Sequence, residues 1–315
     1  MVAGLLMRLR CTPMARPRLA ILSRKKSLYS TSRLVEASLA AEVHPIVMDT
    51  LRCTMLVATG SSKLFYRGAD VKDLTAAVPR IGASITGYGV LVVNHLEAMG
   101  VPVLNTARGI SRSRDKLRAL QLLAQGDIDV PRTVMAMRGA VVGHLAEQVG
   151  GLPCIIKLLR GTQGVGVMIA NTVAEVQTIL RTFWGLGHDV CLQEFVHESK
   201  GRDVRALVVG DRVVGAMRRK AKRGEFRSNL HRGGQGKPVR LDEVYVSTAV
   251  RAARIIGLEI CGVDMLEGAS GPKVIELNSS PGFEGLERAT GEDIAGAMVQ
   301  HALELGGRGE KAPPR

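Results

Sequence analysis

The stretch Leu258–Gly285 constrains the fold of this chain more than any other part of the sequence. Two apolar runs flank the turn-forming residues EGASGP, a pattern that predicts a β-hairpin with a loose loop. Asp264 lies within the first run, and Glu276 and Asn278 lie in the second. Alternate residues of a strand share a face, so Glu276 and Asn278 point to the same side. The hairpin therefore carries three oxygen-bearing side chains among apolar residues.

Two interpretations of these oxygen side chains are open from the hairpin alone. Buried carboxylates are unfavourable without a counter-charge, and a hard divalent ion would supply one. Mg²⁺ takes oxygen ligands and is usually held by one or two carboxylates together with substrate phosphates. Alternatively, the acidic residues form the solvent-facing side of an ordinary hairpin. The rest of the chain favours the metal site.

Composition and charge restrict the class of protein. The chain has 315 residues, 46% of them hydrophobic, which is typical of a folded protein with two or three domains. No apolar run approaches the length of a membrane-spanning helix, so no membrane contact is expected. The formal net charge of +14 favours polyanionic partners or reflects an arginine-rich solvated surface. An aromatic content of 3% argues against nucleic-acid binding by base stacking, and no sequence-specific nucleic-acid contact is expected.

The cysteines and the chain ends bear on location. The five cysteines form no CxxC pair, and their odd number fits a reducing cytosol without structural zinc. A cytoplasmic location is therefore expected. Residues 1–16 are basic and free of acidic side chains, and residues 307–315 resemble a linker, so both ends are expected to be disordered. Translation from Met14 is an alternative, since Met14 lies just before the first predicted strand.

Alternating strands and helices between residues 17 and 106 predict a small parallel α/β domain. The predicted strands are Arg18–Ser23, Pro45–Asp49, Lys63–Tyr66, Ala76–Ile81 and Val101–Leu104, and the predicted helices are Thr31–Glu42 and Thr86–Met99. Ser23-Arg24, Tyr29-Ser30 and Pro79–Gly82 lie where strands should end, the usual place for ligand contacts in open α/β sheets. Ordinary turn chemistry explains each of these segments at least as well.

A glycine-rich hairpin lies in the next region, residues 107–188. An amphipathic helix over residues 111–124, with Lys116 near its start, precedes it. The hairpin is LPCIIKLLRGTQGVGVMIA, and Lys157 lies in its first strand. Its loop contains Gly161, Thr162, Gln163, Gly164 and Gly166. Backbone amides of such a loop can approach phosphate oxygens, and a strand lysine can reach the same phosphates. The loop is neither a P-loop nor a dinucleotide fingerprint, but the lysine favours a nucleotide over an ordinary hairpin.

Residues 189–306 contain further candidate site residues. A predicted strand ends in Glu194 and Phe195, which can bind the amino group of adenine, although many strand edges end in this way. The following hairpin places Asp203 and Arg205 on one face.

Two basic segments come next in the chain. The run Arg218–Arg223 is expected to be a solvated face, as most such runs are. The segment Arg227–Gly234 is rich in glycine and hydrogen-bond donors, which suits an anion site as well as a solvated loop. His231 alone is a weak catalytic candidate.

In this order and spacing, the motifs resemble those of ATP-grasp ligases, and more closely those of the RimK type. The segments that carry the resemblance are AILSR, LYS, PRIG, RDKLRALQLLA, IIKLLRGTQGVGV, LQEF, GRDVRALVVGD, EFRSNLHRGG, CGVDML, IELNSSPGFEGLE and TGEDIAG. The resemblance runs from about Pro17 to about Glu304. It implies an α/β chain in which a small parallel pre-ATP-grasp domain, residues 17–106, precedes a two-part α+β ATP-grasp domain. The two parts would be a small lid, residues 107–188, and a catalytic part, residues 189–306.

The resemblance also implies a role for each candidate residue. The ATP site would consist of Lys116, Lys157, Gly161, Thr162, Gln163, Gly164, Gly166, Glu194, Phe195, Asp203, Arg227, Ser228 and Asn229. In it, the lysines and the glycine-rich loop would bind the phosphates, residues 194 and 195 adenine, and Asp203 the ribose.

The catalytic residues would be Arg227, Asn229 and Arg205. Arg205, Arg218 or His231 would hold the acceptor or the amino-acid carboxylate. The metal ligands would be Asp264, Glu276 and Asn278. They would carry two Mg²⁺ ions, with Mn²⁺ as an alternative and Glu276 as the bridging ligand.

The implied reaction is formation of an amide bond at the expense of ATP. ATP would phosphorylate a carboxylate to an acyl phosphate, and the amino group of L-glutamate would attack it. The implied acceptor is the acidic C-terminal tail of small-subunit ribosomal protein six, and the implied assembly is a homo-oligomer, a dimer or tetramer. Two departures from the family pattern, Arg160 and Ser279-Ser280, remove none of the proposed ligands.

Two alternative functions are open from the sequence. One keeps the ATP-grasp chemistry but acts on a small molecule or a carrier protein, because acceptor pockets diverge faster than ATP sites. The other is an inactive ribosome- or RNA-binding module that uses the basic surface. The intact set Asp264, Glu276 and Asn278 argues against the second alternative, which salt-dependent RNA binding without ATP turnover would support.

Overall fold

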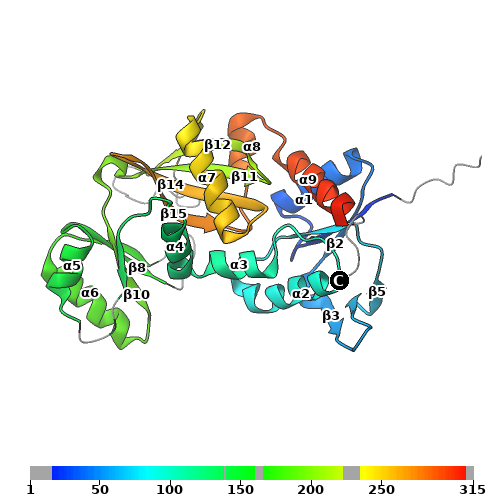
Figure 1. Ribbon diagram of the computed structural model, residues 1–315, viewed down its shortest axis with the longest axis horizontal. Coiled ribbons are helices and arrows are strands. Elements are labelled where there is room, and N and C mark those ends of the chain that lie inside the picture. The colour runs from blue at the N-terminus through cyan, green and yellow to red at the C-terminus, as the bar shows by residue number, and fades with distance from the viewer. Residues whose placement is uncertain (1–15, 136, 138–139, 160–165, 223–234, 310–315) are drawn as a thin grey trace, which may run out of the picture.

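The structure, a computed structural model, describes residues 16–135, 137, 140–159, 166–222 and 235–309. In these ranges the chain forms two three-stranded sheets, one four-stranded sheet and one five-stranded sheet, with helices packed against them (Figure 1). None of the described helices is long and apolar enough to cross a membrane.

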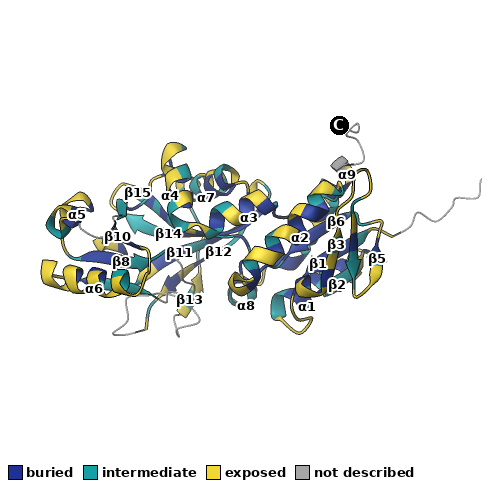
Figure 2. Ribbon diagram, turned by 90° about the horizontal axis from the view of Figure 1, so that it is seen from below, coloured by how far each residue is buried: buried dark blue, intermediate teal, exposed yellow. Residues whose placement is uncertain are grey.

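The N-terminal sheet is parallel, with strand order β2-β1-β6, which confirms the predicted parallel α/β domain. Its strands are β1 (Arg18–Leu22), β2 (His44–Met48) and β6 (Ala76–Pro79), and two of its helices are α1 (Tyr29–Ala40) and α2 (Thr86–Ala98). Every apolar residue of the central strand β1 is fully buried. Leu19 and Ile21 pack in one cluster with Leu34 of α1, whereas Ala20 and Leu22 pack in another with Val92 of α2. The sheet is therefore covered on both faces, as a parallel sheet requires, and Figure 2 shows how far each of its strands and helices is buried.

Two of the predicted strands do not join this sheet. Lys63–Tyr66 is β4, the middle strand of a separate antiparallel sheet with β3 (Cys53–Leu56) and β5 (Ala69–Val71). The segment between β4 and β6 is shorter than the crossover that parallel neighbours need. The segment Val101–Leu104 forms no strand and contributes one isolated parallel bridge, between Val103 and Ala77.

The last helix, α9 (Ile294–Gly309), completes the N-terminal domain. In Figure 1 it lies beside α1, although the two helices are at opposite ends of the chain. Met298 and Ala302 of α9 are fully buried in the same cluster as Leu34 of α1 and Leu19 of β1. The chain therefore returns to its starting domain, and one face of the parallel sheet depends on residues from its C-terminal end.

The lid sheet is antiparallel, with strand order β7-β10-β8-β9. Its strands are β7 (Thr133–Met135), β8 (Cys154–Leu158), β9 (Val167–Ala170) and β10 (Val190–Glu194), and its helices are α5 (Val142–Gln148) and α6 (Val173–Gly185). Leu145 and Leu180 of these helices pack with Ile156 and Leu192 of the central strands. The strand β10 follows the boundary expected at residue 188, yet it pairs with β7 and β8 at the centre of this sheet.

The helix predicted over residues 111–124 is two helices, α3 (Ala107–Arg114) and α4 (Lys116–Gln125). Asp115 separates them because its backbone is extended and its carboxylate accepts a hydrogen bond from the amide of Arg118 at 3.0 Å. Such a side-chain cap starts a new helix. As a result, Lys116 is the first residue of α4, and its side chain points in a different direction from the one it would have in a single continuous helix.

The largest sheet is antiparallel, with strand order β13-β12-β11-β14-β15. Its strands are β11 (Arg202–Val209), β12 (Arg212–Lys220), β13 (Gln235–Pro238), β14 (Ile260–Gly268) and β15 (Gly271–Asn278), and the helices near it are α7 (Glu243–Ile256) and α8 (Glu284–Thr290). Short 3₁₀ segments complete the described structure at Thr50–Arg52, Ala83–Ile85 and His197–Ser199. The predicted hairpin is β14-β15, but its turn is tight, because Gly268 pairs with Gly271. Gly271 has a φ of +130°, which favours glycine and removes the need for a loose loop.

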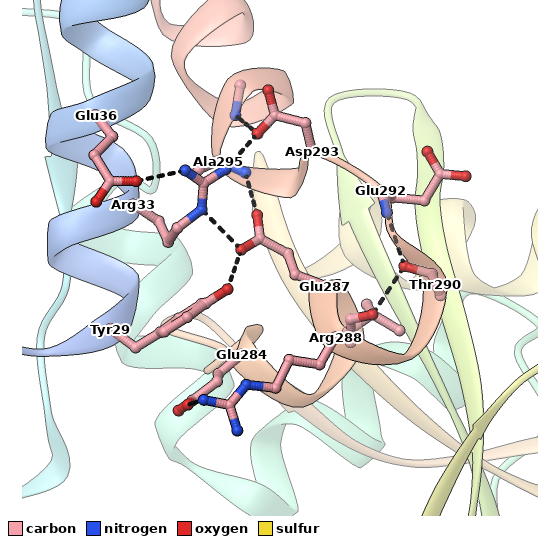
Figure 3. A network of polar contacts seen from close by, with 12 residues as sticks. Tyr29, Arg33, Glu36, Glu284, Glu287, Arg288, Thr290, Glu292, Asp293 and Ala295 are labelled. Atoms are coloured by element: carbon pink, nitrogen blue, oxygen red, sulfur yellow. Dashed lines mark hydrogen bonds and ion pairs between the residues drawn. The ribbon is translucent and has the colours of Figure 1, made fainter.

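Glu287 of α8 connects the catalytic part to the N-terminal domain (Figure 3). Its carboxylate accepts hydrogen bonds from Tyr29 Oη at 2.8 Å, from Arg33 Nε at 3.1 Å and from the amide of Ala295 at 3.1 Å. Tyr29 and Arg33 belong to α1, and Ala295 lies in the first turn of α9. One nearly buried carboxylate thus holds three helices together.

Replacing Glu287 with alanine is expected to lower the free energy of unfolding by about 1.5–3 kcal/mol, the usual contribution of hydrogen bonds to a charged group. Thermal unfolding of the purified variant would measure this loss. Glu284→Ala is the matched control, because Glu284 is on the same helix and pairs only with Arg288 at the surface. Equal unfolding temperatures for the two variants would show that the network contributes no more than a surface pair.

Candidate active site

The register of the β14-β15 hairpin brings the three predicted metal ligands to one face. Asp264 lies opposite Glu276, and Gly262 lies opposite Asn278. Directly opposed residues of an antiparallel pair point to the same side of the sheet. The prediction that Glu276 and Asn278 share a face is confirmed, and Asp264 joins them from the neighbouring strand. Glu276 is exposed, Asp264 is buried, and Asn278 is intermediate.

Asp264 has a counter-charge from the protein itself. Arg205 donates to both carboxylate oxygens, Nε to Oδ1 at 2.6 Å and Nη2 to Oδ2 at 2.6 Å, and Arg219 Nη2 lies 2.9 Å from Oδ2. Burial alone would raise the pKa of Asp264, but the two guanidinium groups lower it to about 2. The sequence argument that this carboxylate needs a metal ion as its counter-charge is therefore wrong for Asp264.

Arg219 is one of the side chains that sequence reasoning missed. It belongs to the run Arg218–Arg223, which was expected to be solvated, but Arg219 is 2% exposed. Alternate residues of β12 point to opposite faces, so Arg218 turns outward to Glu267 while Arg219 turns inward. Arg219 lies opposite Asp203 in the register and donates its Nε to Asp203 Oδ1 at 2.6 Å. The expectation of a solvated run is wrong at this residue.

The two predicted phosphate-binding lysines meet beside Glu276. Lys116, Lys157 and Glu276 line one small cavity of about 40 Å³. Lys157 Nζ donates to Gln193 Oε1 of the neighbouring strand at 2.5 Å. Burial lowers the pKa of Lys157, and the nearby charge of Lys116 lowers it further. A half-buried lysine beside a second lysine is a favourable place for an anion, because the negative charge offsets both effects.

A second cavity, of about 140 Å³, connects Lys157 to the residues predicted for adenine and ribose. The predicted residues that line it are Lys157, Glu194, Phe195, Asp203, Asp264 and Glu276. The structure therefore brings together side chains from β8, β10, β11, β14 and β15. Glu194 also accepts a hydrogen bond from the amide of Arg132 at 2.9 Å and lies 3.5 Å from Lys273 Nζ, so its carboxylate is fixed at the cavity edge.

Several predicted residues lie outside the described ranges. They are Gly161, Thr162, Gln163, Gly164, Arg227, Ser228 and Asn229, together with Arg160 and His231. Gly166, the last glycine of the loop, is described and has a φ of +76°. A Cβ at this position would lie 2.5 Å from Leu158 Cδ1, so the backbone here accommodates only glycine without displacement.

A larger cavity, of about 1050 Å³, lies between the N-terminal domain and the hairpin. Glu276 and Asn278 form part of its wall, and Lys116 lies at its edge with the lid. Two arginines, Arg80 and Arg114, also line this cavity. Arg80 is in the PRIG segment whose position at a strand end suggested a ligand contact, whereas no sequence signal singled out Arg114.

Asn105 fixes the wall of this cavity. It is fully buried, donates to the carbonyls of Ile260 and Ser279 at 2.8 Å each, and accepts from the amide of Ile260 at 2.8 Å. Its side chain thus ties the segment between the N-terminal domain and α3 to the start of β14 and the end of β15. Sequence reasoning missed this residue, since its partners are more than 150 residues away along the chain.

Comparison with known families identifies the fold and its two parts. Residues 18–110 match the RimK PreATP-grasp domain, and residues 113–302 match the RimK-like ATP-grasp domain. The chain belongs to the RimK-like ATP-grasp family. This membership makes it an ATP-dependent ligase, and it confirms the fold class that the motifs predicted.

Similar proteins of the RimK-like family extend over nearly the whole chain. A protein of Vibrio vulnificus named "Probable alpha-L-glutamate ligase" is 48% identical over 283 residues, covering 90% of this chain and 94% of the relative. A protein of Rhodopirellula baltica with the same name is 51% identical over 284 residues, covering 90% of this chain and 70% of the relative.

Solved structures show the same fold. The ATP-grasp ligase PsnB in complex with a minimal precursor has a TM-score of 0.74 at 24% identity, with 92% of this chain and 99% of that chain covered. The macrocyclase MdnC from Microcystis aeruginosa, bound to its precursor peptide, has a TM-score of 0.71 at 15% identity. At these identities the likeness concerns the fold alone.

Proposed function

We propose that this RimK-like ligase adds L-glutamate to the C-terminal glutamate of a small-subunit ribosomal protein through an acyl-phosphate intermediate. The observation that carries the proposal is the cavity that joins Lys157, Glu194, Asp203 and Glu276. These residue types at these positions suit a nucleotide whose phosphates end beside the β14-β15 hairpin. The relatives named alpha-L-glutamate ligase support glutamate as the amino acid.

In the proposed reaction, a carboxylate oxygen of the acceptor attacks the γ-phosphorus of ATP. The bond between this phosphorus and the bridging oxygen breaks, and ADP leaves. The amino nitrogen of L-glutamate then attacks the acyl carbon, loses a proton and expels phosphate. Lys116 and Lys157 would stabilise the charge on the phosphate oxygens, and the larger cavity would admit the acceptor.

The hairpin oxygens fit Mg²⁺ in type and in position. Glu276 lines both the cavity of about 140 Å³ and the larger cavity, Asn278 lines the larger one, and Asp264 lines the smaller one. When bound, Mg²⁺ would neutralise phosphate charge. Asp264 would have to share or exchange a guanidinium contact to serve as a ligand, because both of its oxygens accept from arginine. Two ions with Glu276 between them, and replacement by Mn²⁺, are part of the proposal.

The partners of the proposed reaction follow from charge. A formal net charge of +14 suits an acidic acceptor tail, since opposite charges raise the rate of encounter. We also propose that the protein works in the cytoplasm as a homo-oligomer, a dimer or a tetramer. The described cysteines at positions 53, 154, 191 and 261 are free and buried, which is compatible with a reducing location.

The test is ADP release with Mg-ATP and L-glutamate, with and without purified small-subunit ribosomal protein six. Mass spectrometry would follow the acceptor. Turnover that requires the ribosomal protein, with mass gains in glutamate steps, would establish the reaction. Turnover on glutamate with another acceptor would replace the ribosomal substrate by a small molecule or carrier protein. Salt-dependent RNA binding without turnover would favour a binding module.

Replacing Lys157 with methionine is expected to raise the KM for ATP roughly 10- to 100-fold, the effect of losing one charge-assisted hydrogen bond to phosphate. Methionine keeps the length of the side chain and suits the buried position. Titration of ATP in the ADP-release assay would measure the change. Lys237→Met, on the distant strand β13, is the control. An unchanged KM for ATP would remove Lys157 from the phosphate site.

A further inference from the structure

The larger cavity contains two arginines without an acidic partner among the described residues. Arg80 and Arg114 both line this cavity, and no ion pair joins either guanidinium group to a carboxylate in the described part of the chain. Most other arginines near the site have such a partner, as Arg205 and Arg219 do. A cationic pair left without an anion inside a cavity calls for an anionic ligand.

Arg80 is held in place by the catalytic part, although it belongs to the N-terminal domain. Its Nη2 donates to the carbonyl of Pro281 at 2.6 Å, and its guanidinium carbon lies 5.7 Å from the centroid of the Phe283 ring. Its Nε is buried and has no hydrogen-bond partner among the described residues. Burial lowers the pKa of Arg80 to about 10, which shows how little compensating charge surrounds it.

Arg114 is also oriented by a backbone carbonyl. Its Nη2 donates to the carbonyl of Ile81 at 2.6 Å, the residue that follows Arg80, and its buried Nε is also without a partner among the described residues. Burial lowers its pKa, while the charge of Glu276 acts in the opposite direction. Each guanidinium is therefore oriented by one backbone carbonyl and keeps further N–H groups for a ligand.

Hydroxyl groups complete the surroundings of the two arginines. Ser279 and Ser280 line the same cavity, and their buried Oγ atoms have no hydrogen-bond partner among the described residues. Further hydroxyl groups in the lining belong to Ser23, Ser30, Thr31, Ser84, Thr86 and Ser113. Guanidinium forks combined with hydroxyl donors match the acceptor pattern of a carboxylate.

We propose that Arg80 and Arg114 form a subsite that binds a carboxylate of a glutamyl substrate other than the carboxylate that reacts. This inference rests on the proposed function, because a glutamyl substrate brings more than one carboxylate into the cavity. The carboxylate belongs either to free L-glutamate or to the glutamyl end of the acceptor. Glu276 and Asn278 line the same cavity and would hold the metal ion at the reacting carboxylate, so the two arginines are left for the second carboxylate.

The subsite explains why the N-terminal domain and the catalytic part meet at this cavity. The ligand would contact Arg80 from the N-terminal domain, Arg114 from α3, and the Ser279-Ser280 segment that follows β15. Binding a carboxylate here would bring all three elements onto one substrate. The charge of the substrate would thereby be selected by residues that do not contact the nucleotide cavity of about 140 Å³.

The test is steady-state ADP release by Arg80→Gln and Arg114→Gln, titrated with L-glutamate, with a synthetic peptide ending in two glutamates, and with ATP. Each variant is expected to raise the KM for one of the two glutamyl substrates roughly 10- to 100-fold, while the KM for ATP changes less than about twofold. A raised KM for L-glutamate assigns the subsite to the incoming amino acid. A raised KM for the peptide assigns it to the acceptor.

A second comparison separates recognition of charge from a structural role. The same variants are assayed with L-glutamine, which lacks the side-chain carboxylate, with L-isoglutamine, which lacks the α-carboxylate, and with peptides in which the side-chain carboxylate of the last or of the penultimate glutamate is replaced by an amide. For the carboxylate that the subsite binds, its replacement by an amide is expected to lower kcat/KM of the wild-type enzyme as much as the arginine substitution does, and to lower kcat/KM of the variants little further. Variants that lose kcat/KM equally with the carboxylate and the amide form of every one of these substrates would overturn the proposal.

Arg118→Gln is the matched control, because Arg118 is exposed on the neighbouring helix α4 and its loss removes the same charge. An equal rise in KM in this control would reduce the effect to net charge and overturn the subsite. If Arg80→Gln fails to fold, Arg80→Lys retains the charge and Arg114→Gln tests the subsite independently.

Calorimetric binding of L-glutamate and of the peptide in the presence of Mg-ADP tests the arginine subsite separately from the proposed ligase reaction. Binding that is weakened in Arg80→Gln, without any turnover in the wild type, would keep the subsite and remove the proposed ligase reaction. Turnover that both variants leave unchanged would keep the ligase reaction and remove the subsite. Absence of saturable binding of either probe to the wild type would also overturn the subsite.

Discussion

Replacing Glu276 with glutamine is expected to lower kcat by about 10³-fold or more while the protein remains folded. Glu276 is exposed on the edge strand β15, so its charge contributes little to stability. It lines all three cavities around the nucleotide and acceptor space. A carboxylate there would hold the Mg²⁺ that neutralises phosphate charge, and metal-assisted charge stabilisation supplies several kcal/mol.

ADP release at saturating Mg-ATP would measure the loss, and thermal unfolding would confirm the fold. Glu284→Gln is the control, because Glu284 is an exposed glutamate whose partner is Arg288 on the surface of α8. We expect the control to keep full activity. A Glu276→Gln variant with turnover within about tenfold of the wild type would remove Glu276 from the metal site.

Replacing Arg219 with methionine is expected to lower the free energy of unfolding by about 3–5 kcal/mol, the loss typical of breaking a buried ion pair. Arg219 is 2% exposed and lies between Asp203 and Asp264, whose side chains are also nearly buried. Its removal leaves two neighbouring carboxylates with one guanidinium fewer. Urea unfolding of the variant would measure the change.

The same charges predict how stability depends on pH. The pKa of Asp264 in the folded protein is about 2, below its ordinary value of 3.8. A carboxylate with a lowered pKa contributes stability above its unfolded pKa, and this contribution is lost as the pH falls through the folded pKa. We therefore expect the contribution of Asp264 to be complete above about pH 4 and to disappear towards pH 2.

Arg218→Met is the matched control for Arg219→Met, because Arg218 is the neighbouring residue on the outer face of β12 and pairs with Glu267 at the surface. A surface pair contributes about 0–1 kcal/mol, so this control should unfold nearly as the wild type does. Two results would contradict the role given to the buried pair. One is a similar unfolding free energy for the two variants, and the other is an unchanged loss of stability at acid pH in Arg219→Met.

Sequence reasoning succeeded where the information is local. The two apolar runs around residue 270 predicted the hairpin, and the period of two along β15 placed Glu276 and Asn278 on one face. The order of the motifs correctly indicated the family, whereas the phosphate-binding role of the glycine-rich loop and Lys157 stays a prediction. Each of these signals lies within a short segment, where backbone geometry alone determines which side chains share a side.

It failed where partners come from distant segments. The sequence shows Asp264 as a carboxylate in an apolar run, but not that Arg205, 59 residues earlier in the chain, lies opposite it in the next strand. It shows a run of basic residues, but not that one of them turns inward. The single helix expected over residues 111–124 was wrong because the side chain of Asp115 caps a second helix.

The sequence by itself determined the family, the hairpin, and six of the residues that line the cavity of about 140 Å³, because these depend on the type and spacing of nearby residues. The tertiary structure decided which charges neutralise Asp264, that α9 closes the N-terminal domain, and that Arg80 and Arg114 line one cavity. These features depend on the register between strands and on the packing of domains. Both arise from contacts across long sequence separations, which local periodicity does not encode.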